Sequence, residues 1–245
     1  MIRGVFFDFY GTLVGWQPAG PQIQTTAAAA EGVSVDSAAV GRAYSIANAY
    51  LDSENARSLI ASRNAAERDA TLSEYERRLL SAAGVEVGIA VAGRIWQRVN
   101  DAPKELVPFA EARTALEAVR AAGLSTGVIS NMGKELPSIV DGMRLGHLVD
   151  VVVSSGQVGV GKPHAPIFEA ALRQAGLAAS EAVHVGDSYE GDVVGAQGVG
   201  MYAILVAGPE DMDQANTGPV PADCPRVTSL AAVVPHLREA GLIPY

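Results

Sequence analysis

The sequence predicts an α/β fold in which a doubly wound parallel sheet carries a helical domain inserted after its first strand. Two observations predict this class. After Pro108, short apolar segments of strand length alternate with segments whose apolar residues recur at helical spacing. Between residues 16 and 103 the chain is instead rich in Ala, Glu and Arg and poor in β-branched runs. We therefore expect a core formed by residues 1–15 and 104–245, and a helical cap formed by residues 16–103.

The elements of the core are expected in a regular order. Residues Gly4–Leu13 form a strand that ends in a turn. The later strands are short and apolar, and glycines mark the ends of two helices because glycine tolerates left-handed backbone geometry. The expected strands are Ser125–Ser130, Val149–Ser154, Ala182–Val185 and Tyr202–Val206, and the expected helices are Ala110–Ala122 ending at Gly123, His164–Ala175 ending at Gly176, a short helix beginning at Val193–Ala196, and Leu230–Ala240.

Two segments of the cap show helical spacing most clearly, Ser37–Asn48 and Leu72–Ala83. In the second segment Tyr75 and Leu79 fall on an apolar face, and Glu76 falls on the opposite, charged face. We expect Ser73 to be the N-cap of this helix, because Glu76 follows three residues later as in a capping box.

Composition limits the possible partners. The chain has 245 residues, 49% of them hydrophobic, and a net charge of −9, which is typical of a globular protein with a sizeable core. The negative charge disfavours nucleic acids and anionic membranes, which need basic patches, but allows a small anionic substrate. The single cysteine, Cys224, favours a reducing, cytoplasmic setting, and no apolar run approaches the ~20 residues of a membrane span. Both a monomer and a homodimer fit the sequence.

Polar side chains follow several of the expected strands. Asp8 comes after the first strand. Ser130 and Asn131 follow the apolar segment Ser125–Ile129, and Asp187 follows the strand that ends at Val185. Lys162 follows a glycine-rich stretch. Taken singly, each has a structural explanation as a turn residue, a helix start or an N-cap. Because the carboxyl ends of parallel strands meet at one edge of a sheet, their common placement predicts a single site.

At this point the chain resembles a known family. The segment Asp8-Phe9-Tyr10-Gly11-Thr12-Leu13 is similar to D-x-D-G-T-[LV], the first motif of the haloacid dehalogenase-like hydrolase superfamily. The later polar segments match the other motifs of that superfamily in order. The resemblance implies a Rossmann-like core with an inserted helical cap, and a hydrolase whose nucleophile is Asp8.

The resemblance also implies roles for the other site residues. Lys162 would neutralise the nucleophile and the transferring group, and Ser130 would donate a hydrogen bond to a phosphate. The implied substrate-binding or phosphate-binding residues are Ser130, Asn131, Tyr10 and Gly11. The implied ligands of a Mg²⁺ ion are Asp8, the backbone carbonyl of Tyr10, Asp187 and Asp192, which is a set of oxygen donors that suits a hard cation.

Tyr10 is the departure from the family pattern. In the phosphatases of the superfamily this position is a second Asp, which acts as general acid and base. A tyrosine has a pKa near ~10 and is a poor base at neutral pH, and loss of acid–base help typically costs ~10²–10⁴ in rate. One interpretation is a Mg²⁺-dependent phosphatase that acts on a small phosphorylated metabolite, slowly or on substrates with good leaving groups.

Two alternatives stay open. The first is a metal-independent 2-haloacid dehalogenase, because similar dehalogenases carry Tyr at this position and a halide leaves without a proton. Such an enzyme needs an arginine for the substrate carboxylate, and the cap candidates are Arg57, Arg63, Arg68 and Arg77. The second is a ligand-binding homologue with impaired catalysis. The segment Gly186-Asp187-Ser188 resembles the phosphatase form of the last motif and favours the Mg²⁺-dependent phosphatase.

Overall fold

The computed structural model describes residues 1–206, 221 and 223–244. The described chain divides into two compact units. One comprises Met1–Gly15 and the described residues from Val107 onward, and the other comprises Trp16–Leu106. In the part of the chain that the structure describes, every helix is too short or too polar to span a bilayer.

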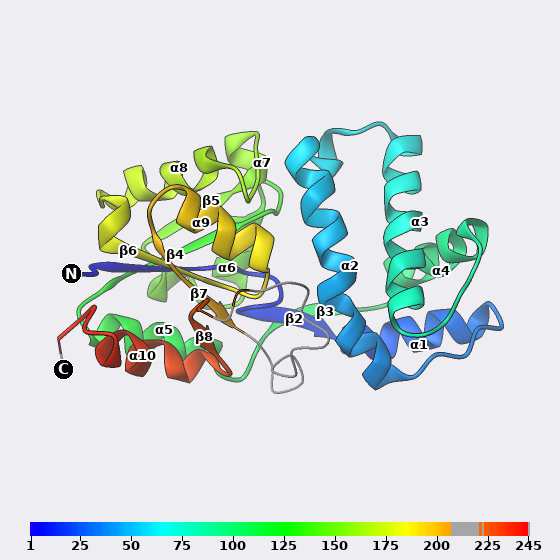
Figure 1. Ribbon diagram of the computed structural model, residues 1–245, viewed down its shortest axis with the longest axis horizontal. Helices are drawn as coiled ribbons and strands as arrows, with labels where there is room; N and C mark the ends of the chain where they lie inside the picture. The colour runs from blue at the N-terminus through cyan, green and yellow to red at the C-terminus, as the bar shows by residue number, and fades with distance from the viewer. Residues whose placement is uncertain (207–220, 222, 245) are drawn as a thin grey trace. The chain divides into compact units, whose positions relative to one another are not determined.

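The first unit is built on a six-stranded parallel sheet with the order β5-β4-β1-β6-β7-β8 (Figure 1). The strands are β1 (Gly4–Phe7), β4 (Ser125–Ser130), β5 (Val151–Ser154), β6 (Ala182–Gly186), β7 (Tyr202–Val206) and β8 (Arg226–Val227). The chain adds β4 and β5 on one side of β1 and then β6 and β7 on the other, which confirms the doubly wound fold. In open α/β sheets ligands bind beyond the carboxyl ends of the strands where the strand order reverses, which here is the end of β1.

Helices cover both faces of this sheet (Figure 1). α5 packs against α10, and α8 packs against α9. Phe168 of α8 is fully buried in a cluster with Phe6 of β1 and Ile129 of β4, which explains the continuous apolar runs of these strands. The helices of this unit are α5 (Ala112–Ala121), α6 (Leu136–Gly142), α7 (Ser155–Val158), α8 (Ala165–Ala175), α9 (Gly195–Gly198) and α10 (Val233–Glu239), with a π-helical turn at Tyr189–Val194 before α9.

The expected helix ends at Gly123 and Gly176 are confirmed. Both glycines have positive φ, at 76° and 66° respectively, and each follows the last residues of its helix. A residue with a Cβ atom would be strained in this conformation.

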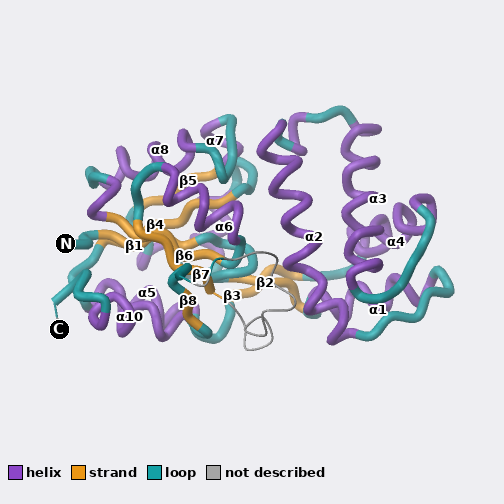
Figure 2. Tube along the Cα trace, viewed as in Figure 1, coloured by secondary structure: helices purple, strands orange, loops and turns teal. Residues whose placement is uncertain are grey.

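The second unit contains four α-helices among its described residues, coloured purple in Figure 2. They are α1 (Gly20–Ala30), α2 (Ser37–Arg57), α3 (Ala65–Ala82) and α4 (Ile89–Asp101). α3 packs against both α2 and α4, and α1 packs against α2 and α4. One cluster joins Val40 and Ala43 to Tyr75 and Leu79, so the apolar face expected for α3 is buried against α2.

The sequence pattern did not indicate β2 (Val14–Gln17) and β3 (Glu105–Pro108), which pair in a two-stranded sheet. Each strand has only four residues, and buried and exposed positions do not alternate along it. A segment this short gives too few positions to establish a period of two.

The N-cap expected at Ser73, for the helical segment Leu72–Ala83, is wrong. α3 begins at Ala65, and Asn64 forms the capping box with Glu67, through bonds of 3.0 Å from the Glu67 backbone N–H and 3.2 Å to the Glu67 carboxylate. The first turns of α3 are too polar to show the period that marks the later turns. Glu76 does not lie on the charged face either, because it is fully buried and accepts a hydrogen bond from Gln24 Nε2 at 3.0 Å.

Candidate active site

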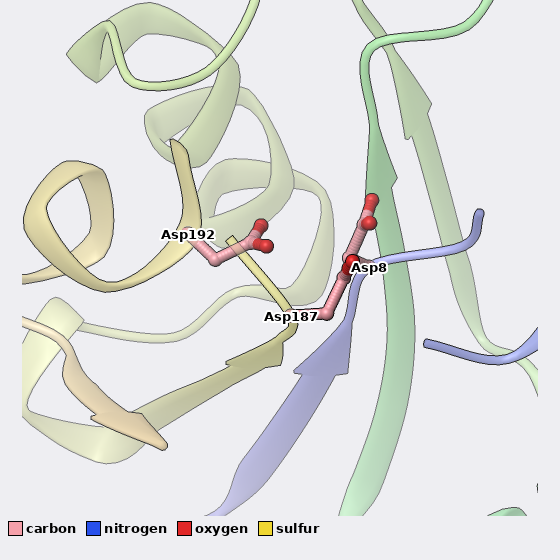
Figure 3. Close-up of side chains that lie close together, drawn as sticks. All are labelled: Asp8, Asp187 and Asp192. Carbon is pink, nitrogen blue, oxygen red and sulfur yellow. The ribbon is translucent and has the colours of Figure 1, made fainter. Parts of the chain in front are cut away.

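Three carboxylates meet at the carboxyl edge of the sheet (Figure 3). Asp8 stands at the tip of β1, Asp187 just beyond β6, and Asp192 on the helical turn that follows. The Asp8 backbone N–H donates to the Val185 carbonyl at 2.8 Å, which extends the ladder between β1 and β6 into the site. One oxygen from each carboxylate lies within 4.8 Å of the other two.

Glycines allow these carboxylates to approach the backbone. Gly11 has φ +91°, and a Cβ there would lie 2.4 Å from Asp187 Oδ2. A Cβ at Gly186 would lie 2.2 Å from the carboxylate of Asp192. Real Cβ atoms do not come this close, so both positions require glycine for steric reasons, and Gly11 also for its backbone geometry. Thr12 Oγ1 donates to Asp187 Oδ1 at 3.1 Å and fixes the orientation of that carboxylate.

Lys162 links two of the carboxylates. Its buried Nζ donates to Asp8 Oδ1 at 2.6 Å and to Asp192 Oδ1 at 2.5 Å. Asp192 Oδ1 also lies 2.8 Å from His184 Nε2, and Asp192 Oδ2 accepts from the Ser188 backbone N–H at 3.0 Å. Because a carboxylate accepts hydrogen bonds, His184 Nε2 carries the hydrogen in this contact. Asp192 therefore receives three donors and is firmly oriented.

The charges at this edge are strongly coupled. Burial raises the pKa of Asp8 above its usual value, and the positive charge of Lys162 offsets this only in part. For Asp192, burial acts in the same direction, but Lys162 and the hydrogen bond from His184 outweigh it and lower the pKa. Burial also opposes the charge of Lys162, yet Asp192 and Asp8 raise its pKa above the usual value. Lys162 therefore stays charged and Asp192 stays ionised at neutral pH.

Asp187 differs from the other two carboxylates because its side chain keeps an exposed surface. The surrounding protein atoms, and then the negative charges of Asp8 and Asp192, raise the pKa of Asp187 well above its usual value. Lys162 is the cation that the described residues bring to this cluster, and its ammonium pairs with Asp8 and Asp192. Three carboxylates facing one ammonium form a set of hard oxygen donors that fits Mg²⁺ and lacks the Cys or His of a structural zinc site.

Ser130 and Asn131 lie at the end of β4. Val128 pairs with Phe7, so Ser130 ends its strand beside the start of the Asp8 turn, and its side chain is buried. Asn131 lies against the backbone of Lys162: its Oδ1 accepts from the Lys162 N–H at 2.7 Å, and its Nδ2 donates to the Lys162 carbonyl at 3.0 Å.

Tyr10 lies in the turn after Asp8, where its backbone bridges to Val14. The residue is 44% exposed. Partial burial of the ring, followed by the negative charge of Asp187, raises the pKa of Tyr10 to about 12. The phenol therefore stays protonated at neutral pH, and it can donate a hydrogen bond but cannot serve as a base.

The structure thus brings Asp8, Lys162, Asp187 and Asp192 into one cluster, and it places Ser130, Asn131, Tyr10 and Gly11 on the turns that surround it. Sequence reasoning missed His184 and Thr12. His184 lies inside an apolar strand, where its neighbours in sequence give no sign of a polar partner, and its contact with Asp192 depends on the geometry of the following π-helical turn. Thr12 belongs to the first motif, and its position there was a signal that could have found it.

The four cap arginines considered as carboxylate ligands all have partners within the second unit. Arg63 is the most enclosed, and it donates to Glu54 at 2.7 Å and to Thr71 at 2.8 Å. Arg57 donates to Glu54, and Arg68 donates to the Arg63 carbonyl. Arg77 donates to both oxygens of Glu74. Each of the four arginines therefore has an acidic or carbonyl partner within the second unit.

Comparisons with known proteins agree with this geometry. Residues 2–200 match the family described as haloacid dehalogenase-like hydrolase. The chain is 34% identical over 163 residues to haloacid dehalogenase-like hydrolase domain-containing protein 3 of Bos taurus, covering 65% of each protein. It is 41% identical over 103 residues to glyceraldehyde 3-phosphate phosphatase of Methanothermobacter thermautotrophicus, covering 41% of this chain and 45% of the phosphatase. The matched segments therefore span about half to two thirds of these relatives.

The structure of L-2-haloacid dehalogenase from Xanthobacter autotrophicus superposes with a TM-score of 0.60 and 21% identity, over 98% of this chain and 99% of that one. At this level of identity the likeness concerns the fold.

Proposed function

Because the chain belongs to the haloacid dehalogenase-like hydrolase family, we propose that it is a Mg²⁺-dependent phosphatase that acts on a small phosphorylated metabolite through Asp8. The observation that carries this proposal is the cluster itself: Asp8 is paired with Lys162 at 2.6 Å, inside a group of three carboxylates whose oxygens lie within 4.8 Å. The relative that is named a glyceraldehyde 3-phosphate phosphatase supports a phosphate ester as the substrate.

The side chains suggest how each step would proceed. The Asp8 carboxylate attacks phosphorus and forms an aspartyl-phosphate, while the bond between phosphorus and the ester oxygen breaks and that oxygen leaves with the bonding electrons. The ammonium of Lys162 offsets negative charge on the transferring group. The Ser130 hydroxyl donates a hydrogen bond to a phosphoryl oxygen. Asp8, the Tyr10 carbonyl and Asp187, supported by Asp192, would hold Mg²⁺. The ion would supply the positive charge that lets an anionic nucleophile approach an anionic group.

Tyr10 determines which substrates react well. Its protonated phenol donates a hydrogen bond to the departing oxygen, but it cannot accept a proton from the water that hydrolyses the aspartyl-phosphate. We therefore expect esters with good leaving groups to be preferred, and hydrolysis of the phosphoenzyme to be the slow step.

A 2-haloacid dehalogenase is the second candidate, and Tyr10 is the feature that favours it, because halide departure needs no acid. Two observations count against it. The cap arginines are engaged with acidic or carbonyl partners. The carboxylates of Asp187 and Asp192 would also repel a haloacid carboxylate unless a cation lay between them.

The test is hydrolysis of an aryl phosphate with Mg²⁺ and with a chelator, in the wild type and in Asp8→Asn. The matched control is Asp141→Asn, because this aspartate is exposed on α6 outside the cluster. Turnover that requires both Mg²⁺ and Asp8, and survives in the control, would support the proposal. Metal-independent release of halide from 2-chloropropanoate would instead support the second candidate. Phosphate binding without any turnover would indicate a ligand-binding homologue.

A further inference from the structure

The side-chain amide of Asn131 is engaged with one residue, Lys162. Its oxygen accepts from the backbone N–H of Lys162 at 2.7 Å, and its nitrogen donates to the backbone carbonyl of the same residue at 3.0 Å. An amide that pairs with both groups of one residue imitates the pairing between two strands, and it fixes the position and the direction of that backbone. Gly161 permits this approach, since a Cβ there would lie 2.4 Å from Asn131 Oδ1.

Lys162 needs such support because it lies outside regular secondary structure. It comes after α7, which ends at Val158, and before α8, which begins at Ala165. Its long side chain nevertheless reaches Asp8 and Asp192 with short contacts of 2.6 and 2.5 Å. A shift of this backbone by ~1 Å would break both contacts, and misplacement on that scale can cost ~10² in rate.

We propose that Asn131 is a positioning residue, which holds the backbone of Lys162 so that its ammonium reaches the nucleophile, and that it contributes to the reaction through Lys162. The proposal revises the expectation that Asn131 binds phosphate itself. It rests on the proposed function only for the role of Lys162. The competing view is that the second hydrogen of Asn131 Nδ2 contacts the phosphoryl group independently of the lysine.

The first experiment measures the position of Lys162 without any turnover. The sequence contains three lysines, Lys104, Lys134 and Lys162; Lys134 is exposed, and Lys162 is buried at 4% exposure. Brief acetylation with acetic anhydride, followed by peptide mass spectrometry, gives the labelling of Lys162 relative to Lys134. We expect this ratio to be low in the wild type and to rise about tenfold or more in Asn131→Ala, because the freed lysine moves into water.

Two controls separate positioning from loss of stability. Ser130→Ala changes the neighbouring residue, which does not bind the lysine backbone, and should leave the ratio low. Val140→Ala weakens the core at α6, where this valine is buried, without touching the lysine, and it should leave the ratio low as well. A low ratio in Asn131→Ala, or an equal rise in Val140→Ala at matched thermal stability, would overturn the proposal.

The second experiment is a double-mutant cycle with Lys162→Met, which keeps the length of the side chain and removes its charge. We expect Asn131→Ala to lower kcat/KM for an aryl phosphate about 10²-fold in the wild-type background and less than about twofold in the Lys162→Met background. An equal loss in both backgrounds would identify Asn131 as an independent phosphate ligand and overturn the proposal. Absence of wild-type turnover would count against the proposed function, whereas the labelling result would still decide the role of Asn131.

Discussion

Glu76 should make the stability of the cap depend on pH, in a way that a single substitution removes. This glutamate of α3 is fully buried and accepts a hydrogen bond from Gln24 Nε2 of α1 at 3.0 Å. Among the buried side-chain atoms of the described residues, Glu76 Oε1 and Gln24 Oε1 have no hydrogen-bond partner. A proton on Glu76 Oε1 would let it donate to the Gln24 oxygen, so protonation would satisfy both atoms at once.

The size of the effect follows from the pKa. Burial raises the pKa of Glu76 from 4.5 to about 7, and the hydrogen bond from Gln24 opposes this only in part. At about 1.4 kcal/mol for each pH unit, the difference corresponds to roughly 3 kcal/mol of unfolding free energy. The folded state holds its proton more tightly than the unfolded state does. The stabilisation is therefore complete below pH ~4.5 and is lost as the pH rises through about 7.

Glu76→Gln should remove this dependence. The new amide cannot ionise, and its NH₂ group can donate to Gln24 Oε1 while its oxygen accepts from Gln24 Nε2. We expect the variant to match the wild type near pH 4.5 within about 1 kcal/mol, and to exceed it by roughly 3 kcal/mol at pH 8. Asp69→Asn is the matched control, because this acid lies exposed on the same helix.

Tryptophan fluorescence suits the measurement, because both tryptophans of the chain, Trp16 and Trp96, lie in the second unit. Urea unfolding followed at several values of pH would then report on this unit. Parallel pH profiles for the wild type and Glu76→Gln would refute the reasoning, as would an equal flattening of the profile in Asp69→Asn.

Three further outcomes are expected in the core. Tyr10→Asp restores an acid–base group and should raise kcat/KM, which reports formation of the phosphoenzyme, about 10²–10⁴-fold on an alkyl phosphate and less on an aryl phosphate; steady-state kinetics on the two esters would contradict this if the gains in kcat/KM were equal. Gly11→Ala should weaken Mg²⁺ binding measured by calorimetry, because its Cβ would meet Asp187 at 2.4 Å. The control is Gly123→Ala, which also has positive φ but has no atom within 4 Å of its Cβ. This control should bind Mg²⁺ as the wild type does. His184→Leu should lower kcat about tenfold or more by releasing Asp192, and His184→Gln, which keeps a donor, should retain most of it; similar losses in both variants would argue for a packing role.

The core was predictable because its signals are local. β4 and β7 were expected at Ser125–Ser130 and Tyr202–Val206, and the structure has the same bounds. Apolar runs of strand length, and the polar residues that follow several of them, are visible in a few neighbouring letters. A parallel sheet then brings those residues together whatever the detail of the connecting helices.

The remaining features depend on contacts between segments distant in sequence. Glu76 was placed on the charged face of α3 because its neighbours are charged, and only packing against Gln24 of α1 shows that it is buried. The resemblance implies that Asn131 binds substrate or phosphate, and only the tertiary structure shows that its amide pairs with a backbone 31 residues later. Polar side chains carry no periodic signal for their partners, so these roles require the tertiary structure.

Three carboxylates of this chain are compensated in different ways, and the difference bears on the active site. Asp192 keeps its charge because Lys162 and His184 donate to one of its oxygens. Glu76 has an amide donor and no cation among its described contacts, so its pKa rises and a proton neutralises it. Among the described side chains, the hydroxyl of Thr12 is the one that donates to Asp187, although Asp8 and Asp192 lie beside it. An exposed carboxylate crowded by two others, with one shared lysine, is compensated best by a divalent cation, and this need favours the metal-dependent phosphatase over a metal-independent dehalogenase.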